Sequence, residues 1–345
     1  MPIQNFTGFF VSLRLTHATM PRWVKQLLRV SASVLILVLL FLRVDEASLL
    51  RSLAEIRLPQ FVLAATSLLP LFLLPAFAQH RLFAGVSLRM PLLSIYSINL
   101  KSMFYSLVLP GDVASATARF IKFSKIDQSK NRMDAGSKSA PIVTVTVVDR
   151  LLNIQGMALL AGLLVFTVPL PGSAVWFQRA SGIIFVAIGI AFALGRSHSL
   201  PRLLRLGPPV LHRVLHFFEE AARAFGTLTL SRMGIAFLIL ALYQFATVAV
   251  VDLLLASSLN LTVPLLPFIA ISAIVRLARY IPITFSGIGV REGLYPLFLA
   301  PFGVPLEISF GLGLIGSSVV ILYGALGALL EAIEIGLPKR LKARR

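Results

Sequence analysis

Two segments of the chain place arginine beside helix-breaking residues, within regions that are otherwise apolar. In hydrocarbon each unpaired backbone N–H or C=O group costs several kcal/mol, so a broken helix persists there only when it packs inside protein or lines a cavity. A planar guanidinium can bind a phosphate through two parallel hydrogen bonds. The chemistry to expect is therefore recognition of an anionic headgroup within the membrane.

The first segment runs from Leu109-Pro110-Gly111-Asp112 to Arg119. We expect Pro110 and Gly111 to break the backbone and Arg119 to bind the headgroup. The alternative is a cytoplasmic loop whose basic side chains only touch the membrane surface.

The second segment leads from Arg276 and Arg279, which share one face of a helix, to Arg291. We expect all three arginines to bind the headgroup. Glycine permits positive φ or the close approach of a ligand, and a helix N-terminus favours an anion. The residues expected to break the backbone here are Pro282, Ser286, Gly287 and Gly289.

Asp149 and Arg150 form an adjacent pair of opposite charge where an apolar run begins. Neighbouring residues on a helix project about 100° apart, so each needs a partner on another helix. We expect Asp149, Arg150 and Glu292 to balance the charge of the arginines, with Asp149 facing Arg119 or Arg291. The alternative is an interfacial pair whose side chains reach toward the headgroups.

The composition is that of a polytopic, all-α membrane protein, because 57% of the 345 residues are hydrophobic, 13% are charged and the mean hydropathy is +0.88. The net charge of +18 lies in loops and tails, where the positive-inside rule explains it. Nucleic acid is therefore not an expected partner. The absence of cysteine excludes disulfides and thiol nucleophiles.

We expect one membrane domain with basic ends. A basic cytoplasmic N-terminus (1–26) precedes the domain (27–336), and a basic cytoplasmic tail (337–345) follows it. A basic cytoplasmic linker at 195–233 joins its two halves, 27–194 and 234–336.

Seven regular spans are expected, at 27–43, 58–79, 142–169, 173–194, 234–258, 264–281 and 307–336. Charge places both termini in the cytoplasm, which requires an even number of crossings. We therefore expect 282–304 to cross as a broken helix, making about eight crossings, and 91–120 to be re-entrant. Arg119 and Arg291 stand 172 residues apart (291 − 119), which suggests an inverted repeat with one broken helix in each half; a chance spacing is the alternative.

Neither a cofactor nor a metal is expected. His212, His216 and Glu219 have a spacing that a metal site could use, but they belong to a basic amphipathic stretch typical of a helix on the membrane surface. The chain contains no Walker loop, nucleotide fingerprint or nucleophile elbow, and we expect no catalytic residues.

At these residues the chain resembles the lysylphosphatidylglycerol synthetase transmembrane-region family of flippase-like membrane proteins. The resemblance extends from Leu35 to Leu330. It rests on three blocks: Asn99 with Leu109-Pro110-Gly111 and Arg119; Asp149-Arg150-Leu151; and Pro282 with the run Ser286 to Gly293. Members often carry Gly-Asp shortly before the first arginine, whereas here Val113 to Ala118 intervenes.

The resemblance implies a multi-pass domain of the bacterial-type cytoplasmic membrane that moves a lipid headgroup between leaflets. No synthetase domain is present in the sequence, so lysyl transfer is not carried over. We expect a flippase-like protein that translocates or binds an anionic or glycosylated lipid, and not an enzyme. The alternatives are an accessory subunit that presents a lipid to a biosynthetic enzyme and, less well supported, an intramembrane enzyme acting on a lipid-linked phosphate. Expected partners are membrane lipids, with a second copy of the chain or a lipid-biosynthetic enzyme as further candidates.

Overall fold

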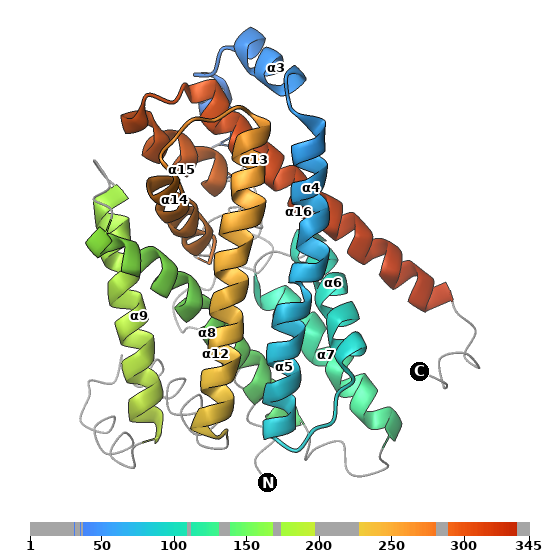
Figure 1. The fold of residues 1–345 in the computed structure, drawn as a ribbon. Coiled ribbons are helices and arrows are strands. Elements are labelled where there is room, and N and C mark those ends of the chain that lie inside the picture. Colours follow the sequence, from blue (N-terminus) through green and yellow to red (C-terminus); the bar gives the residue numbers. More distant parts are fainter. Residues whose placement is uncertain are drawn as a thin grey trace, which may run out of the picture.

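The computed structural model of the chain describes residues 31, 35, 37–108, 112–130, 139–167, 174–196, 228–280 and 289–336. Within these ranges the secondary structure is helical and contains no strand (Figure 1). Several of the helices are long and apolar. The expected all-α, polytopic membrane architecture is therefore confirmed.

Among the described residues, four helical segments are long and apolar enough to cross a membrane. The shortest has 23 residues, which corresponds to about 35 Å at 1.5 Å per residue and exceeds the roughly 30 Å of a hydrocarbon core. They coincide with four of the expected spans. The four are Leu58–Gly85, Pro141–Leu163, Leu230–Ser258 and Leu306–Gly336.

The first half of the chain contributes a short helix at one end of the molecule and then a series of longer ones. The elements are α3 (Glu46–Ala54), α4 (Leu58–Leu71), α5 (Leu73–Gly85), α6 (Leu92–Val108), α7 (Asp112–Lys130), α8 (Ser139–Thr167) and α9 (Ala174–Arg196). Pro70 lies inside α4, where it removes a backbone hydrogen bond. Pro75, in the first turn of α5, likewise has no N–H for the Leu71 carbonyl, and the long span is divided into α4 and α5 at Phe72.

The second half is built from a similar set. Its elements are α12 (Leu230–Ala246), the π-helical turn η1 (Thr247–Asp252), α13 (Leu253–Ser258), α14 (Leu265–Ala278), α15 (Val290–Leu299), the 3₁₀ turn η2 (Ala300–Phe302) and α16 (Leu306–Gly336). The turn η1 joins α12 and α13 into one long span.

The order of helices from α4 to α8, the first series, is repeated from α12 to α16, the second series. Each series consists of a long span, two further helices and a second long span. The start of α12 follows that of α4 by 172 residues (230 − 58), and the start of α14 follows that of α6 by 173 (265 − 92). In Figure 1, α4 and α5 run away from the end that carries α3, whereas α12 and α13 run toward it. The two series therefore have opposite directions, as in the inverted repeats of many transporters.

A regular span is expected at 264–281 and a broken helix at 282–304, and the helices described there are short. The first, α14, has 14 residues, and the second, α15, has 10. At 1.5 Å per residue they measure about 21 Å and 15 Å, so neither spans the hydrocarbon core alone. Pro282 follows the apolar run, and hydropathy does not show where a helix must end.

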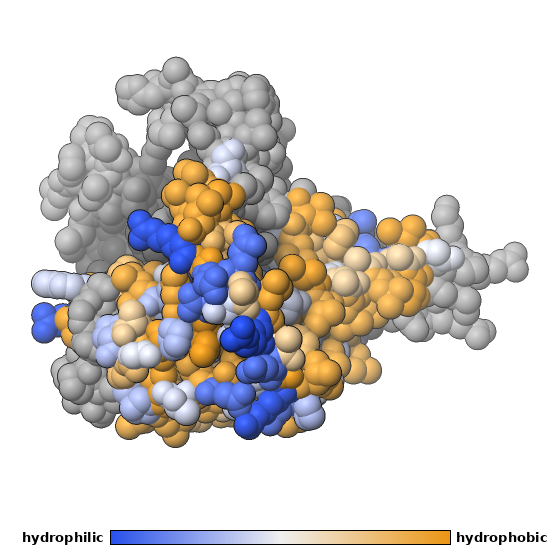
Figure 2. Space-filling view, turned by 90° about the horizontal axis from the view of Figure 1, so that it is seen from above, coloured by the Kyte–Doolittle hydropathy of each residue, from blue (hydrophilic) through white to orange (hydrophobic). Residues whose placement is uncertain are grey.

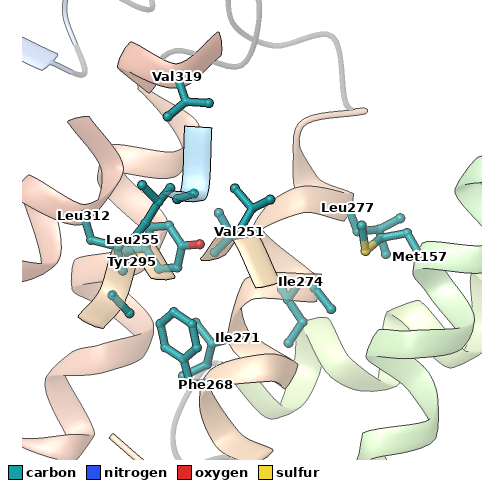
Figure 3. Packing of buried hydrophobic residues seen from close by; sticks show 14 of the residues in the cluster. Met157, Val251, Leu255, Phe268, Ile271, Ile274, Leu277, Tyr295, Leu312 and Val319 are labelled. Atoms are coloured by element: carbon teal, nitrogen blue, oxygen red, sulfur yellow. The ribbon is translucent and has the colours of Figure 1, made fainter. Parts of the chain in front are cut away.

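Two large apolar clusters fill the interior. The first-series core draws side chains from α5, α6, α7, α8 and α12, among them Phe83, Ile95, Phe123, Val145 and Leu240. The second-series core is formed chiefly by the α12–α13 span and by α14, α15 and α16, with help from α4 and α8. Figure 3 shows side chains from these helices meeting, with Met157 of α8 at one side.

The outer faces of the long helices are apolar. Large exposed side chains include Leu63 on α4, Trp176 on α9, Leu238 on α12 and Ile321 on α16. Seen from the end that carries α3, polar side chains form a band from the middle to the lower edge of the view, and apolar side chains lie on both sides of it (Figure 2). This distribution suits a protein surrounded by lipid.

Candidate functional site

A buried carboxylate lies at the centre of the first series. The side chain of Asp149, on α8, is 3% exposed. Its Oδ2 accepts a hydrogen bond of 3.0 Å from Gln79 Nε2, on α5, and lies 3.5 Å from Arg119 Nη1, on α7. Three helices thus place polar groups around one acid.

Amide side chains extend this first-series network. Asn153 lies one turn after Asp149 on the same face of α8, and its Nδ2 donates to the Asp149 backbone carbonyl at 2.9 Å. Gln244 Nε2, on α12, donates to Asn153 Oδ1 at 3.2 Å. Arg150 projects to another face and lies within electrostatic reach of Asp149.

A second pair of opposite charges lies in the second series, and its geometry is tighter. Arg276 Nε and Nη2 donate to Asp252 Oδ2 and Oδ1 at 2.6 Å and 2.7 Å. Asp252 ends the π-helical turn η1, and π-turns are frequent at functional sites. The guanidinium of Arg276 is therefore occupied by a protein carboxylate, which the sequence did not indicate.

Arg291 has a different environment. It opens α15 and is only 6% exposed, yet it makes no hydrogen bond or ion pair with any described residue. Its guanidinium lies against Gly316 of α16, where an added methyl group would overlap with Nη1. This glycine lets an arginine side chain enter the interior beside α16.

Glu292 caps the helix that Arg291 opens. Its Oε2 accepts from the backbone N–H of Gly289 at 2.7 Å, and its Oε1 accepts from Ser317 Oγ at 2.5 Å. Gly289 has φ +91°, a conformation that side chains other than glycine rarely adopt. The helix N-terminus expected to attract an external anion is thus already occupied by the carboxylate of Glu292.

Two tyrosines connect these groups electrostatically. Tyr243, on α12, lies within electrostatic reach of Asp149, Arg276 and Arg279. Tyr295, on α15, lies within reach of Asp252, Arg276 and Arg291. Tyr243 thus lies near the acid of the first series and near two arginines of the second.

The four arginines expected to bind a headgroup have different surroundings. Arg119 faces Asp149 and Arg276 is held by Asp252. Arg279 ends α14 and is half-buried.

Several expected site residues lie outside the described part of the chain. They are the backbone-breaking residues Pro110, Gly111, Pro282, Ser286 and Gly287. His212, His216 and Glu219 of the basic linker, which were not expected to bind a metal, also lie outside it. Within the ranges that the structure does describe, no group of three or more His, Cys, Asp or Glu is placed to hold a metal.

A group of four charges, the α16 quartet, joins the two series elsewhere. Lys122 Nζ, on α7, lies 2.8 Å and 2.6 Å from the two carboxylate oxygens of Glu331, and Lys101, on α6, pairs with Glu334. Lys122 also lies 3.9 Å from Glu334. These contacts connect α6 and α7 to the end of α16.

The sequence reasoning missed four of the site's polar residues: Gln79, Asn153, Gln244 and Asp252. A signal for Asp252 was present, because it is the only charged residue in the apolar run 234–258, and an acid in a membrane helix is itself a sign of function. The amides carried no comparable signal, since a polar residue in an apolar helix does not reveal which neighbour it faces.

Comparison with known proteins gives one match. A family model described as "Lysylphosphatidylglycerol synthase TM region" matches residues 26–327. No curated protein and no solved structure gives a significant match.

Proposed function

Because the chain belongs to the lysylphosphatidylglycerol synthase TM region family, we propose that it translocates or binds an anionic or glycosylated lipid between the leaflets of the membrane. The family describes a membrane protein related to lipid modification or transport. The finer assignment, flippase-like translocation, is supported by the residues of the site and by the repeated architecture.

The observation that carries the proposal is the buried side chain of Arg291, which makes no hydrogen bond or ion pair with any described residue. Taking a charge out of water costs several kcal/mol unless a partner of opposite charge compensates it. Among the described residues none lies within ion-pair distance of Arg291, whereas Arg276, a few residues earlier, has a carboxylate on two of its nitrogens. A lipid phosphate would supply the missing partner through two parallel hydrogen bonds.

The inverted arrangement of the two series supports movement as well as binding. In many transporters two repeats of opposite direction contribute interrupted helices on either side of a central site, and rocking of one repeat against the other exposes the site alternately to each face. Here the pairs α6–α7 and α14–α15 take corresponding places in the two series. A headgroup held at Arg291 would cross between them while its tails stay in lipid.

The proposed activity is translocation or binding of the lipid, and it includes no chemical step. We place the protein in the bacterial-type cytoplasmic membrane with both termini in the cytoplasm, on the basis of the basic segments at 1–26, 195–233 and 337–345. Its partners would be membrane lipids, with self-association or a lipid-biosynthetic enzyme as additions.

Leaflet exchange tests the proposal. The purified chain is reconstituted into vesicles containing a lipid labelled on its acyl chain, and a membrane-impermeant reductant reports how fast inner-leaflet label reaches the outer leaflet. We expect acceleration of exchange for lipids with an anionic headgroup and a loss of roughly tenfold or more in Arg291→Ala, since a hydrogen-bonded charge pair contributes about 1.5–3 kcal/mol.

The matched control is Arg57→Ala, which removes an exposed arginine at the start of α4. Its exchange rate should equal that of the wild type. No acceleration for any anionic or glycosylated lipid would contradict translocation. If the protein nevertheless retained lipid through Arg291 and co-purified with a synthase, the accessory-subunit alternative would be favoured.

A further inference from the structure

Five helices each bring one polar residue to the same side of the first-series core. We call these residues the polar layer. Each lies four residues, about one helical turn, from a member of that core and therefore on the same helix face. The pairs are Gln79 with Phe83, Asn99 with Ile95, Arg119 with Phe123, Asp149 with Val145, and Gln244 with Leu240.

The directions of the helices decide on which side of the core these residues lie. In α5 and α7 the polar residue precedes its core partner, and in α6, α8 and α12 it follows. Figure 1 shows α5 and α7 running away from the end that carries α3, and α6, α8 and α12 running toward it. All five polar residues are consequently displaced from the first-series core toward the middle of the molecule.

The polar layer contains buried polar atoms without partners. Gln79 Oε1, both polar side-chain atoms of Asn99 and Arg119 Nε are shielded from solvent and form no hydrogen bond with described residues. Asn99 is 5% exposed and Gln79 is 3% exposed. Buried polar groups in proteins are nearly always hydrogen-bonded, so this concentration of unpaired atoms indicates a ligand.

The types of these atoms restrict the chemistry of the ligand. The carboxylate of Asp149 requires a donor, which fixes the Gln79 amide with its N–H₂ toward the acid and leaves Oε1 as a free acceptor. The amide of Asn99 offers one acceptor and one donor group, and Arg119 Nε is a donor. The layer thus needs a ligand that both donates and accepts hydrogen bonds.

Hydroxyl groups meet this requirement, because each donates one hydrogen bond and accepts others. A phosphate diester only accepts and would leave Gln79 Oε1 unpaired, while an ammonium group only donates and would leave Arg119 Nε unpaired. We propose that the polar layer is the subsite for the free hydroxyl groups of a polyol or sugar headgroup. This inference rests on the proposed function, in which Arg291 receives the phosphate, and it narrows the substrate class to phospholipids whose headgroup carries free hydroxyl groups.

Two lipids that share one phosphodiester charge and the same acyl chains provide the test. The full chain in detergent is incubated with equal amounts of phosphatidylinositol, which has a polyol headgroup, and phosphatidylmethanol, which has no hydroxyl. Native mass spectrometry then measures the ratio of the two lipids retained. We expect the wild type to favour phosphatidylinositol roughly three- to tenfold, as one or two net hydrogen bonds would produce.

Asn99→Leu is the informative variant. The side chain of Asn99 bonds to no described residue, so leucine removes no hydrogen bond from the fold while it removes both polar atoms from the layer. We expect the ratio to fall to about one through weaker retention of phosphatidylinositol. The matched control is Gln60→Leu, because Gln60 Oε1, on α4, is also buried and unpaired but lies outside the polar layer; its ratio should equal that of the wild type.

The other outcomes separate this inference from the proposed function. Equal retention of both lipids by the wild type, abolished by Arg291→Ala, would overturn the hydroxyl subsite and leave the proposed function standing. In a second mixture phosphatidylethanolamine replaces phosphatidylmethanol, and a preference for phosphatidylethanolamine over phosphatidylinositol would assign the layer to an ammonium group instead. A wild-type preference for phosphatidylinositol that Asn99→Leu does not change would place hydroxyl recognition elsewhere. Retention of neither lipid above the level of Arg291→Ala would contradict both proposals.

Discussion

Each helix series contains one buried acid that faces an arginine, and the two pairs differ in geometry. In the second series Arg276 donates hydrogen bonds of 2.6 Å and 2.7 Å to the two carboxylate oxygens of Asp252. In the first series Arg119 lies 3.5 Å from Asp149, and amide groups supply the closer contacts. The tight pair satisfies its own charges and can hold α14 against η1, whereas the loose pair keeps hydrogen-bonding capacity for a ligand.

Two arginines of the second series, Arg276 and Arg291, also differ in whether an acid pairs with them. Arg276 is neutralised inside the protein, while Arg291, beside Gly316, has no acid within reach among the described residues. We infer that Arg276 positions helices and that Arg291 binds the ligand. The following changes test this division, in order of decreasing effect.

Replacing Asp252 by asparagine should produce the largest loss of stability. The substitution leaves the buried guanidinium of Arg276 without a compensating charge, which costs about 3–5 kcal/mol. Denaturation of the purified protein in detergent measures the loss. The double variant Asp252→Asn with Arg276→Met should recover most of it, and a double variant as unstable as the sum of the two single ones would show that the residues do not act as a pair.

Two glycines of α16 separate packing from ligand binding. A methyl group on Gly313 would lie 2.8 Å from Cα and 3.0 Å from N of Glu292, and backbone cannot easily give way. Gly313→Ala should therefore cost about 1–3 kcal/mol of stability.

On Gly316, by contrast, the methyl group would meet only the movable end of Arg291. Gly316→Ala should leave stability nearly unchanged and slow leaflet exchange by displacing the guanidinium. Gly336→Ala, where nothing lies within 4 Å, is the control for both glycines. Exchange at the wild-type rate in Gly316→Ala would argue against the position of Arg291 as a determinant of transport.

Replacing Asp149 by asparagine should cost only about 1 kcal/mol of stability, because an amide oxygen can still accept from Gln79. Leaflet exchange should be affected more strongly, since Arg119 loses the acid that faces it. Asp45→Asn, at the exposed start of α3, is the matched control and should leave exchange unchanged. A loss of stability as large as that of Asp252→Asn would show that the two acid–arginine pairs contribute equally to stability.

The sequence was sufficient for the architecture and for the most unusual arginine. The run from Pro282 to Gly293 combined proline, glycine and charge in an apolar context, which drew attention to Arg291 and Gly289. The separation of 172 residues between Arg119 and Arg291 anticipated the spacing of the two series.

The sequence could not show which side chains contact one another. Whether an arginine is free or paired depends on residues far away in the chain, and Asp252 lies 24 residues before Arg276. The apolar run 264–281 was likewise predicted to be a span. High hydropathy indicates that a segment is shielded from water, but it does not give the length of the helix, and α14 has 14 residues. Glu292 was expected to balance charge, and only the fold shows that it caps α15.

The claim on which the account depends is that Arg291 receives a lipid phosphate. Solid-state NMR can measure this directly, as dipolar coupling between ³¹P of a bound phospholipid and ¹⁵N of labelled arginine side chains in the reconstituted protein. A bidentate contact with N···O distances of about 2.7–2.9 Å should give strong coupling in the wild type that is lost in Arg291→Lys. Coupling of equal strength in the two proteins would contradict the account.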